Sequence, residues 1–155
     1  MLLNLLIGLP TMALCLLLQS ALLSIAIRYY ARYGSLVNSA SPGSTLVVLN
    51  SVMTLLVLGN LAQVTIWAVG FRLLGEFQEL SEAMYHSAVN FSTLGYGDII
   101  MSKRHRLLGP LEAINGVLMI GVSSAALLAA FQDAIRKTTL ARGSPKSLKG
   151  HETLD

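Results

Sequence analysis

Three long hydrophobic stretches dominate the chain, and each is long enough to cross a lipid bilayer, which takes roughly 20 helical residues. The first stretch contains no ionisable side chain apart from Cys15, so it cannot form the solvated face of a soluble domain. We therefore predict an all-α membrane protein with three transmembrane helices. The stretches cover residues 2–27, 45–74 and 107–131.

Polar segments separate and follow these stretches. Residues 34–43 are rich in Ser, Gly, Asn and Pro, which predicts a short, turn-rich connection. Pro10 near the start of the first stretch predicts either a kink or a later start of that helix. Residues 136–155 contain few apolar side chains and predict a basic, disordered tail. The predicted units are residues 1–43 (first span and connection), 44–135 (two spans and the segment between them) and 136–155 (tail).

The segment between the second and third stretches is too polar to be another span. Spaced glutamates precede a more apolar run over residues 83–91, and Ser81 is a candidate helix cap. A helix of about ten residues, rising 1.5 Å per residue, is too short to cross the bilayer. We therefore predict a re-entrant helix, which enters the membrane and turns back.

Composition and charge agree with a membrane protein. The 155 residues are 54% hydrophobic and only 12% charged, unlike an average soluble domain. The net charge is +3, and the basic residues lie near the ends of the apolar stretches, which indicates membrane topology and not nucleic-acid binding. Cys15, in an apolar run, is interpreted as a small packing residue and not as a redox or metal group.

The distribution of basic residues predicts the orientation of the spans, because positive charge favours the inner side. Seven basic residues would lie on one side and four on the other, which places the C-terminus in the cytoplasm and the N-terminus outside. The first stretch lacks a basic start and is interpreted as a retained span and not a signal peptide. The two groups are Arg28, Arg32, Arg136, Lys137, Arg142, Lys146 and Lys149, and Arg72, Lys103, Arg104 and Arg106.

The residues that follow the short helix carry the strongest chemical signal. From Thr93 onward, Gly95 and Gly97 alternate with Leu94 and Tyr96. Glycine reaches backbone angles closed to other residues, so the carbonyl oxygens of residues 93–96 could point towards one axis. Stacked rings of such oxygens, with the Thr93 hydroxyl as a further ring, replace the water around a dehydrated potassium ion. Closing each ring requires several chains.

At this point the chain resembles the potassium-channel pore-domain family, in particular small bacterial two-helix-pore channels. The resemblance lies within residues 59–132 and is densest in AMYHSAVNFSTLGYGDI and RLLGPLEAINGVLMIGVSSA. In that family an outer helix, a pore helix, a T-[VIL]-G-Y-G filter and an inner helix repeat around a four-fold axis. The resemblance implies a homotetramer with residues 93–97 as the filter. It also implies that Asp98 braces the filter or lies at its outer mouth, and that the inner helix can bend at Gly116.

Some positions depart from the family's usual residues. Many members have two aromatic residues in the pore helix where this chain has Tyr85 and His86, and many have Thr where it has Ser92. Leu94 replaces the commoner Val. These changes preserve the hydrogen-bond donors and the side-chain bulk, so the prediction of potassium selectivity is unchanged.

Four residues on the third stretch recur at intervals of four and would share one helix face: Gly116, Ile120, Ser124 and Leu128. The resemblance implies that this face lines the ion cavity. Ordinary helix packing through small residues is the alternative, and the sequence does not separate the two. Asn50, Asn60 and Gln63 are polar residues in the second stretch that we expect to bond to a neighbouring helix.

Three ionisable residues near the short helix invite a functional interpretation. An unperturbed histidine titrates near physiological pH, so His86 is a possible modulator, although packing behind the filter with satisfied hydrogen bonds is the favoured interpretation. Glu112 lies inside the third stretch, where burying an ionised carboxylate is costly. Glu112 is therefore a candidate modulator. We favour a structural contact with Arg106, Arg104 or polar groups of the short helix. His105 is interpreted as an exposed loop residue.

These patterns predict a potassium-selective channel subunit in the plasma (inner) membrane, with no enzymatic activity and no cofactor beyond the permeant K⁺. A weakly selective cation pore and a non-conducting scaffold or accessory subunit are the alternatives. An intramembrane hydrolase using His86 with Ser87 or Ser92 is disfavoured, because adjacent helix positions point about 100° apart. The partners expected are the lipid bilayer and further copies of this chain, with no nucleic acid.

Overall fold

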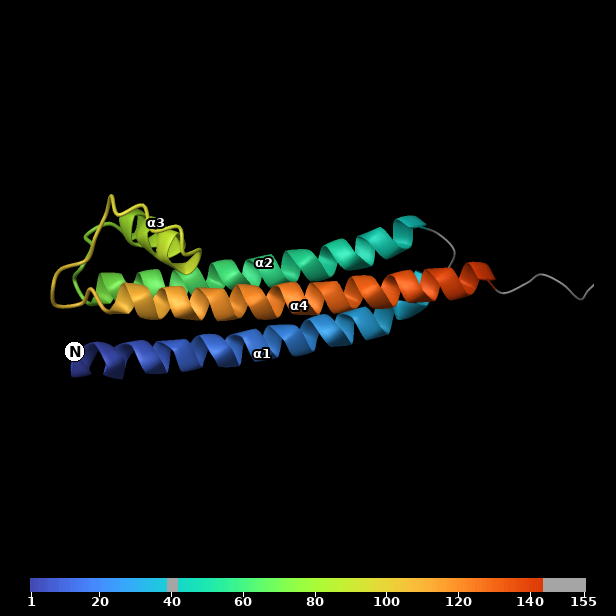
Figure 1. Ribbon diagram of the computed structural model, residues 1–155, viewed down its shortest axis with the longest axis horizontal. Coiled ribbons are helices and arrows are strands. Elements are labelled where there is room, and N and C mark those ends of the chain that lie inside the picture. Colours follow the sequence, from blue (N-terminus) through green and yellow to red (C-terminus); the bar gives the residue numbers. More distant parts are fainter. Residues whose placement is uncertain (39–41, 144–155) are drawn as a thin grey trace, which may run out of the picture.

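The computed structural model describes residues 1–38 and 42–143, and every regular element in this part of the chain is an α-helix. Figure 1 shows three long helices side by side, with the N-terminus and the short helix α3 at the same end of the bundle. The helices are α1 (Leu2–Asn38), α2 (Pro42–Leu73), α3 (Leu80–Phe91) and α4 (Leu108–Gly143).

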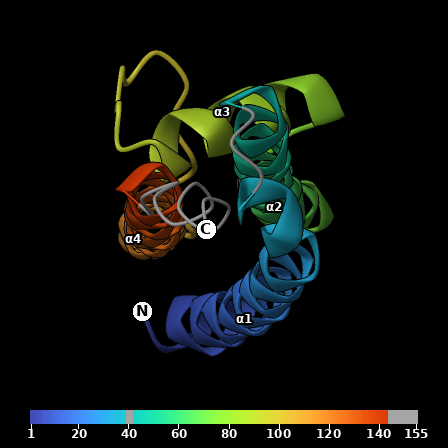
Figure 2. The same cartoon turned by 90° about the vertical axis from the view of Figure 1, so that its right-hand side faces the viewer.

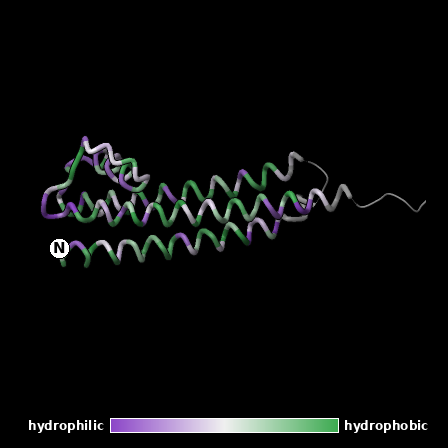
Figure 3. Tube along the Cα trace, viewed as in Figure 1, coloured by the Kyte–Doolittle hydropathy of each residue, from purple (hydrophilic) through white to green (hydrophobic). Residues whose placement is uncertain are grey.

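The three long helices have the length and composition of membrane spans. Their apolar segments contain 32, 29 and 32 residues, and at 1.5 Å per residue each exceeds the hydrocarbon core of about 30 Å. Such stretches fold as helices because lipid offers no partner for backbone N–H and C=O groups. Figure 3 shows hydrophobic positions along the helices and hydrophilic ones in the α3–α4 connection. The predicted all-α class with three candidate spans is confirmed; the spans are Leu2–Tyr33, Thr45–Leu73 and Leu108–Thr139.

The first two long helices extend further than predicted. α1 begins at Leu2 and includes Pro10, so the later start that we considered for this helix is wrong. It continues to Asn38, and α2 begins at Pro42, so most of the predicted connection over residues 34–43 is helical. Proline suits the first position of a helix, because its missing N–H would have no intrahelical partner there.

The last helix also extends further than predicted. α4 continues to Gly143, so the first part of the predicted tail, residues 136–143, is helical, and the rest lies outside the described residues. Two ion pairs of helical spacing support this end of α4: Asp133 lies 3.0 Å from Arg136 and 2.7 Å from Lys137, measured between nitrogen and oxygen.

Figure 2, viewed along the bundle, shows α1, α2 and α4 in a triangular arrangement, with α3 beside α2 on the side away from α1. α1 packs against both α2 and α4, and α3 packs against the same two helices. The largest group of buried apolar residues lies where α3 meets the long helices and includes Trp67, Phe71, Phe77 and Leu108. Cys15 is fully buried in the same group, in agreement with its predicted packing role.

A buried chain of polar side chains joins α1 to the other two long helices near their middle. Gln19 of α1 donates from Nε2 to Oγ of Ser123 on α4, at 2.9 Å. Gln63 of α2 donates from Nε2 to Oε1 of Gln19, at 2.8 Å. All three side chains are buried. The prediction that Gln63 bonds to a neighbouring helix is therefore confirmed.

Further polar contacts hold α1 near both of its ends. Asn4 donates from Nδ2 to the carbonyl oxygen of Arg104, in the α3–α4 connection, at 2.9 Å. At the other end the Tyr30 hydroxyl donates to Oδ2 of Asp133 at 3.1 Å. Polar contacts between membrane helices fix their relative rotation and depth. The additional N-terminal span is thus bound to α2 and α4 along its length.

Replacing Gln19 with Ala is expected to weaken the attachment of α1. The change removes both buried hydrogen bonds of this side chain and leaves Nε2 of Gln63 without its acceptor. Interhelical hydrogen bonds in membranes contribute about 0.6–2 kcal/mol each, so we expect a loss of about 1–3 kcal/mol in the free energy of unfolding. Chemical unfolding of the detergent-solubilised protein measures it.

Ser24→Ala is the matched control for this change. The Ser24 side chain lies on an exposed part of α1 and donates to the Ser20 carbonyl of its own helix. Its removal should leave the free energy of unfolding nearly unchanged. Equal stability of the Gln19 and Ser24 variants would contradict the proposed attachment.

Candidate functional site

The segment after α3 has a backbone conformation that alternates from residue to residue. Thr93, Gly95 and Gly97 have positive φ angles of 60°, 60° and 73°, whereas Leu94 and Tyr96 do not. In a strand, successive carbonyl groups point in opposite directions. When the sign of φ alternates from residue to residue, successive peptide groups instead take a similar orientation. The conformation is therefore suited to presenting a row of carbonyl oxygens on one side.

Thr93 is held in a conformation that is unfavourable for its residue type. Left-handed φ angles cost an L-residue roughly 1–2 kcal/mol, and β-branched residues rarely adopt them. Backbone strain of this kind persists only where the surroundings enforce it, and it gathers at functional sites. At Gly95 and Gly97, in contrast, the side chain that would impose the cost is missing.

Hydrogen bonds to carbonyl groups of α3 hold the start of this segment. The amide N–H groups of Thr93 and Leu94 donate to the carbonyl oxygens of Asn90 and Val89, at 2.8 and 2.9 Å. The Thr93 hydroxyl donates to the Ser92 carbonyl at 2.7 Å, so the lone pairs of its oxygen stay available to a cation. α3 thus positions the segment through carbonyl oxygens of its last turn, which accept hydrogen bonds from the amide groups of the segment.

The rest of the segment is open in the single chain. Leu94 is 56% exposed and Tyr96 is 67% exposed. Two large apolar side chains so exposed, in a segment with strained backbone, indicate a surface that another molecule covers.

Asp98 is held directly after the segment by α3. The Tyr85 hydroxyl donates to its Oδ2 at 2.7 Å, and the Ile99 N–H donates to its Oδ1 at 3.0 Å. The hydrogen bond from Tyr85, with that from Ile99, lowers the pKa of the Asp98 carboxyl below its usual range. Asp98 is therefore an anion that ties the end of the segment to α3.

His86 lies behind the segment with both ring nitrogens hydrogen-bonded. Its Nδ1 lies 2.9 Å from the Ile99 carbonyl, and its Nε2 lies 2.9 Å from Nδ2 of Asn90. A carbonyl only accepts, so Nδ1 carries the proton and Nε2 accepts from the amide. Burial lowers the pKa of His86, and the Ile99 carbonyl opposes that effect only in part. This arrangement is that of a neutral, packed histidine, the interpretation that we favoured from the sequence.

Glu112 of α4 is fully buried and contacts α3. Its Oε1 is hydrogen-bonded to the Ser87 hydroxyl, which lies 2.7 Å from the carbonyl oxygen of Val64 on α2. The predicted contact with a polar group of the short helix is therefore present, and none with Arg104 or Arg106 is seen among the described residues. Ser87 connects three helices at one point.

Replacing Ser87 with Ala is expected to lower stability, because it leaves Glu112 and the Val64 carbonyl without this partner. A buried polar group that loses its partner costs about 1–3 kcal/mol, and we expect a loss of that size in the free energy of unfolding. Chemical unfolding in detergent measures it. Ser81→Ala, at an exposed position of the same helix, is the matched control, and an equal effect of the two changes would contradict the role of Ser87.

Two expectations about side chains near this site are wrong. Ser81 does not cap α3: the cap position is Glu79, and no side chain bonds there. His105 is not an exposed loop residue, since only 5% of it is exposed and its Nδ1 lies 2.5 Å from Oε1 of Glu76. Loop contacts of this kind depend on the three-dimensional arrangement, which the local sequence does not indicate.

Glu76 is a residue of structural importance that the sequence did not single out. Its carboxylate accepts hydrogen bonds from the N–H and the hydroxyl of Ser102, both at 2.6 Å, and one from His105. Burial raises the pKa of Glu76, but these hydrogen bonds outweigh it, so the pKa lies below its usual value. The contacts join the α2–α3 turn to the α3–α4 connection and fix the return path of the chain after the 93–97 segment.

Gly116 of α4 lies directly against the end of α3. A Cβ atom at this position would lie 1.9 Å from the carbonyl oxygen of Phe91 and 2.9 Å from its Cα, so only glycine allows this approach. Ile120, Ser124 and Leu128, which we placed on the same face, are exposed in the single chain. The face of α4 that continues from Gly116 is thus open below the end of α3.

Together these features describe a multi-pass membrane protein in which a short helix between two spans is followed by a strained, exposed segment. The ion-channel family model matches residues 52–133, more than half of the chain, and the protein belongs to this family of ion channels. The match includes α3, the 93–97 segment and most of α4, and it is consistent with a potassium-channel pore domain. Comparisons with curated proteins and with solved structures gave no match.

Proposed function

We propose that the protein is a potassium-selective channel in which four copies of the chain surround one ion pathway. The observation that carries this proposal is the alternation of positive φ angles at Thr93, Gly95 and Gly97, within the sequence Thr-Leu-Gly-Tyr-Gly. Four such segments around an axis would form stacked rings from the carbonyl oxygens of residues 93–96. The Thr93 hydroxyl would add a ring at the inner end. Such rings replace the hydration shell of K⁺, and repulsion between ions in adjacent sites allows rapid exit.

In this proposal α3 is a re-entrant pore helix. Its 12 residues span about 18 Å at 1.5 Å per residue, which is well short of the bilayer core of about 30 Å. Its C-terminal end, which carries the partial negative charge of the helix dipole, precedes the filter and favours a cation below it. Ile120, Ser124 and Leu128 of α4 would line the cavity there. Asp98 would stand at the outer mouth, and Gly116 would be the point where α4 can bend.

Assembly of four copies accounts for the exposure of the 93–97 segment. One chain supplies one filter strand, and a closed coordination shell requires several. Exposed Leu94 and Tyr96 would be covered by neighbouring copies in the assembly. Residues 44–135 would form this pore domain, with α1 as an additional outer span. The distribution of basic residues supports an orientation in which the filter end would lie outside and the C-terminus would lie in the cytoplasm, in a plasma membrane.

Ion flux into liposomes that contain only the purified chain tests this function. We expect uptake of K⁺ far faster than uptake of Na⁺, together with a particle of four chains in detergent. Equal uptake of the two ions would overturn the selectivity. A four-chain particle without any uptake would instead support a non-conducting scaffold.

A further inference from the structure

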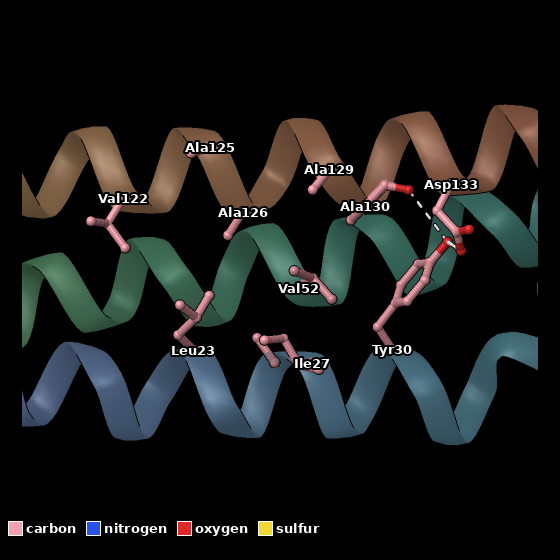
Figure 4. A pocket seen from close by; sticks show the side chains of 11 residues that line it. Leu23, Ile27, Tyr30, Val52, Val122, Ala125, Ala126, Ala129, Ala130 and Asp133 are labelled. Atoms are coloured by element: carbon pink, nitrogen blue, oxygen red, sulfur yellow. Dashed lines mark hydrogen bonds between the residues drawn. The ribbon is translucent and has the colours of Figure 1, made fainter.

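An apolar groove of about 440 Å³ runs between α1 and α4. Figure 4 shows Leu23 and Ile27 of α1 facing alanine side chains of α4, with Val52 of α2 behind them. The small side chains Ala126 and Ala129 leave the space that a larger residue would fill. The groove lies within the candidate spans of all three helices, so its surroundings are the bilayer or another protein chain.

Polar atoms lie at only one end of the groove. There the Tyr30 hydroxyl donates to Asp133, and the Lys137 ammonium group lies 2.7 Å from the same carboxylate. The Lys137 nitrogen also lies 5.2 Å from the centre of the Tyr30 ring. The remaining lining residues are apolar. The groove is thus amphipathic, with a long apolar part and a charged end.

The groove faces away from the proposed ion pathway. Successive helical residues turn by about 100°, so Val122, Ala126 and Ala129 lie roughly 180–240° around α4 from Ile120. Ser124 and Leu128 lie within about 80° of Ile120 on the opposite side. If that side lines the cavity, the groove opens towards lipid.

The length of the groove matches one leaflet of the membrane. From Val122 to Asp133, eleven residues along α4, it extends about 16 Å at 1.5 Å per residue, about half of the hydrocarbon core of roughly 30 Å. Its charged end lies at the end of the bundle where α1 is followed by α2 and where α4 ends. One extended acyl chain therefore fits its length.

The charge around this end favours an anionic headgroup. Four basic side chains accompany one acidic side chain among the described residues there: Arg28, Arg32, Arg136 and Lys137 against Asp133. The Arg136 side chain is paired with Asp133 but is 73% exposed, so a phosphate can still reach it. Basic clusters at the cytoplasmic ends of membrane helices attract anionic lipids.

We propose that this groove binds an anionic phospholipid of the leaflet near the C-terminal end of α4. One acyl chain lies between α1 and α4, and the phosphate contacts the basic residues around Lys137. The site would make α1 a lipid-binding element of the channel. This inference goes beyond the proposed function and does not depend on which ion the protein conducts.

Native mass spectrometry of the full-length protein in detergent tests the site, with phosphatidylglycerol and phosphatidylcholine as the probes. We expect phosphatidylglycerol to stay bound in preference to phosphatidylcholine. Ala129→Leu fills the groove and should weaken phosphatidylglycerol binding at least about tenfold, since it removes the space for the chain. Lys137→Gln should weaken it about fivefold while leaving phosphatidylcholine unchanged.

Two control variants lie outside the groove. Ala13→Leu adds the same bulk at an exposed position of α1, and Lys103→Gln removes a charge at the other end of the bundle; neither should change binding. Equal binding of both lipids, or no effect of Ala129→Leu, would overturn the proposal. So would disulfide formation between copies carrying Ala129→Cys in a Cys15→Ser background, because the groove would then be an interface between subunits.

Discussion

Gly95→Ala should abolish potassium flux. Gly95 has a φ angle of 60°, and placing an L-residue such as alanine at this angle costs roughly 1–2 kcal/mol of conformational free energy. A filter formed by four copies of the variant would therefore be destabilised by about 4–8 kcal/mol. A cost of that size shifts a conformational equilibrium by about a thousandfold or more. The carbonyl at this position would then turn away from the ion pathway. Uptake of K⁺ into liposomes measures the effect.

The expected loss of flux in the Gly95→Ala variant does not come from steric crowding within the chain. A Cβ at Gly95 would have no described atom within 4 Å in the single chain, so the expected loss comes from the backbone angle. Gly70→Ala is the matched control, because Gly70 lies in α2 with equally open surroundings and without a positive φ. Alanine favours a helix interior over glycine, so this variant should conduct normally. Normal conduction by the Gly95 variant would contradict the proposed role of the segment.

Gly116→Ala should disrupt the contact between α3 and α4. The new methyl carbon would lie 1.9 Å from the Phe91 carbonyl oxygen, and only backbone movement can relieve an overlap with backbone atoms. Overpacking of this kind costs about 1–3 kcal/mol and sometimes more. Because Phe91 is followed within two residues by Thr93, the movement would also displace the proposed filter segment, residues 93–97. We expect lower stability in detergent and loss of K⁺ uptake.

Gly121→Ala is the control for this change. Gly121 belongs to the same helix, and a Cβ there would meet no described atom within 4 Å. If the two alanine variants unfolded at the same denaturant concentration and conducted equally, the close approach of α3 and α4 at Gly116 would not be needed for stability or conduction. Loss of uptake in the Gly116 variant without any loss of stability would favour its role as a bending point over its role in packing.

The features that the sequence predicted well are those encoded by neighbouring residues. Three long apolar stretches predict three spans, since lipid leaves a helix as the natural fold for them. Gly95 and Gly97 predict left-handed backbone angles, and both have them. The positive φ of Thr93 is different, because its residue type disfavours that angle. It follows from the hydrogen bonds that hold the segment to α3.

The contacts that join distant parts of the chain could not be predicted in the same way. Gln19 and Ser123 are 104 positions apart, and Glu76 and His105 are 29 apart. No local pattern pairs them, because each contact depends on how the helices pack. His105 was therefore misplaced on the surface. Helix ends were misjudged for a related reason: composition predicts where a polar segment begins but not how far tertiary contacts extend a helix into it.

Hydrogen bonds attach the additional helix α1 to the rest of the molecule. The spans of a minimal pore do not need this helix, yet Asn4, Gln19 and Tyr30 bond it to α2, α4 and the loop that precedes α4. Because Gln19 reaches Ser123 on α4, a shift of α1 along the bundle would act on the proposed inner helix. The additional span is in a position to influence the pore.

The most direct measurement of potassium selectivity is the reversal potential of a planar bilayer that contains only the purified chain. Potassium chloride on one side and sodium chloride at equal concentration on the other make the potential depend on the ratio of the two permeabilities alone. We predict a large reversal potential, with the sign expected when K⁺ is much more permeant than Na⁺. A reversal potential close to zero would contradict a filter built from residues 93–97.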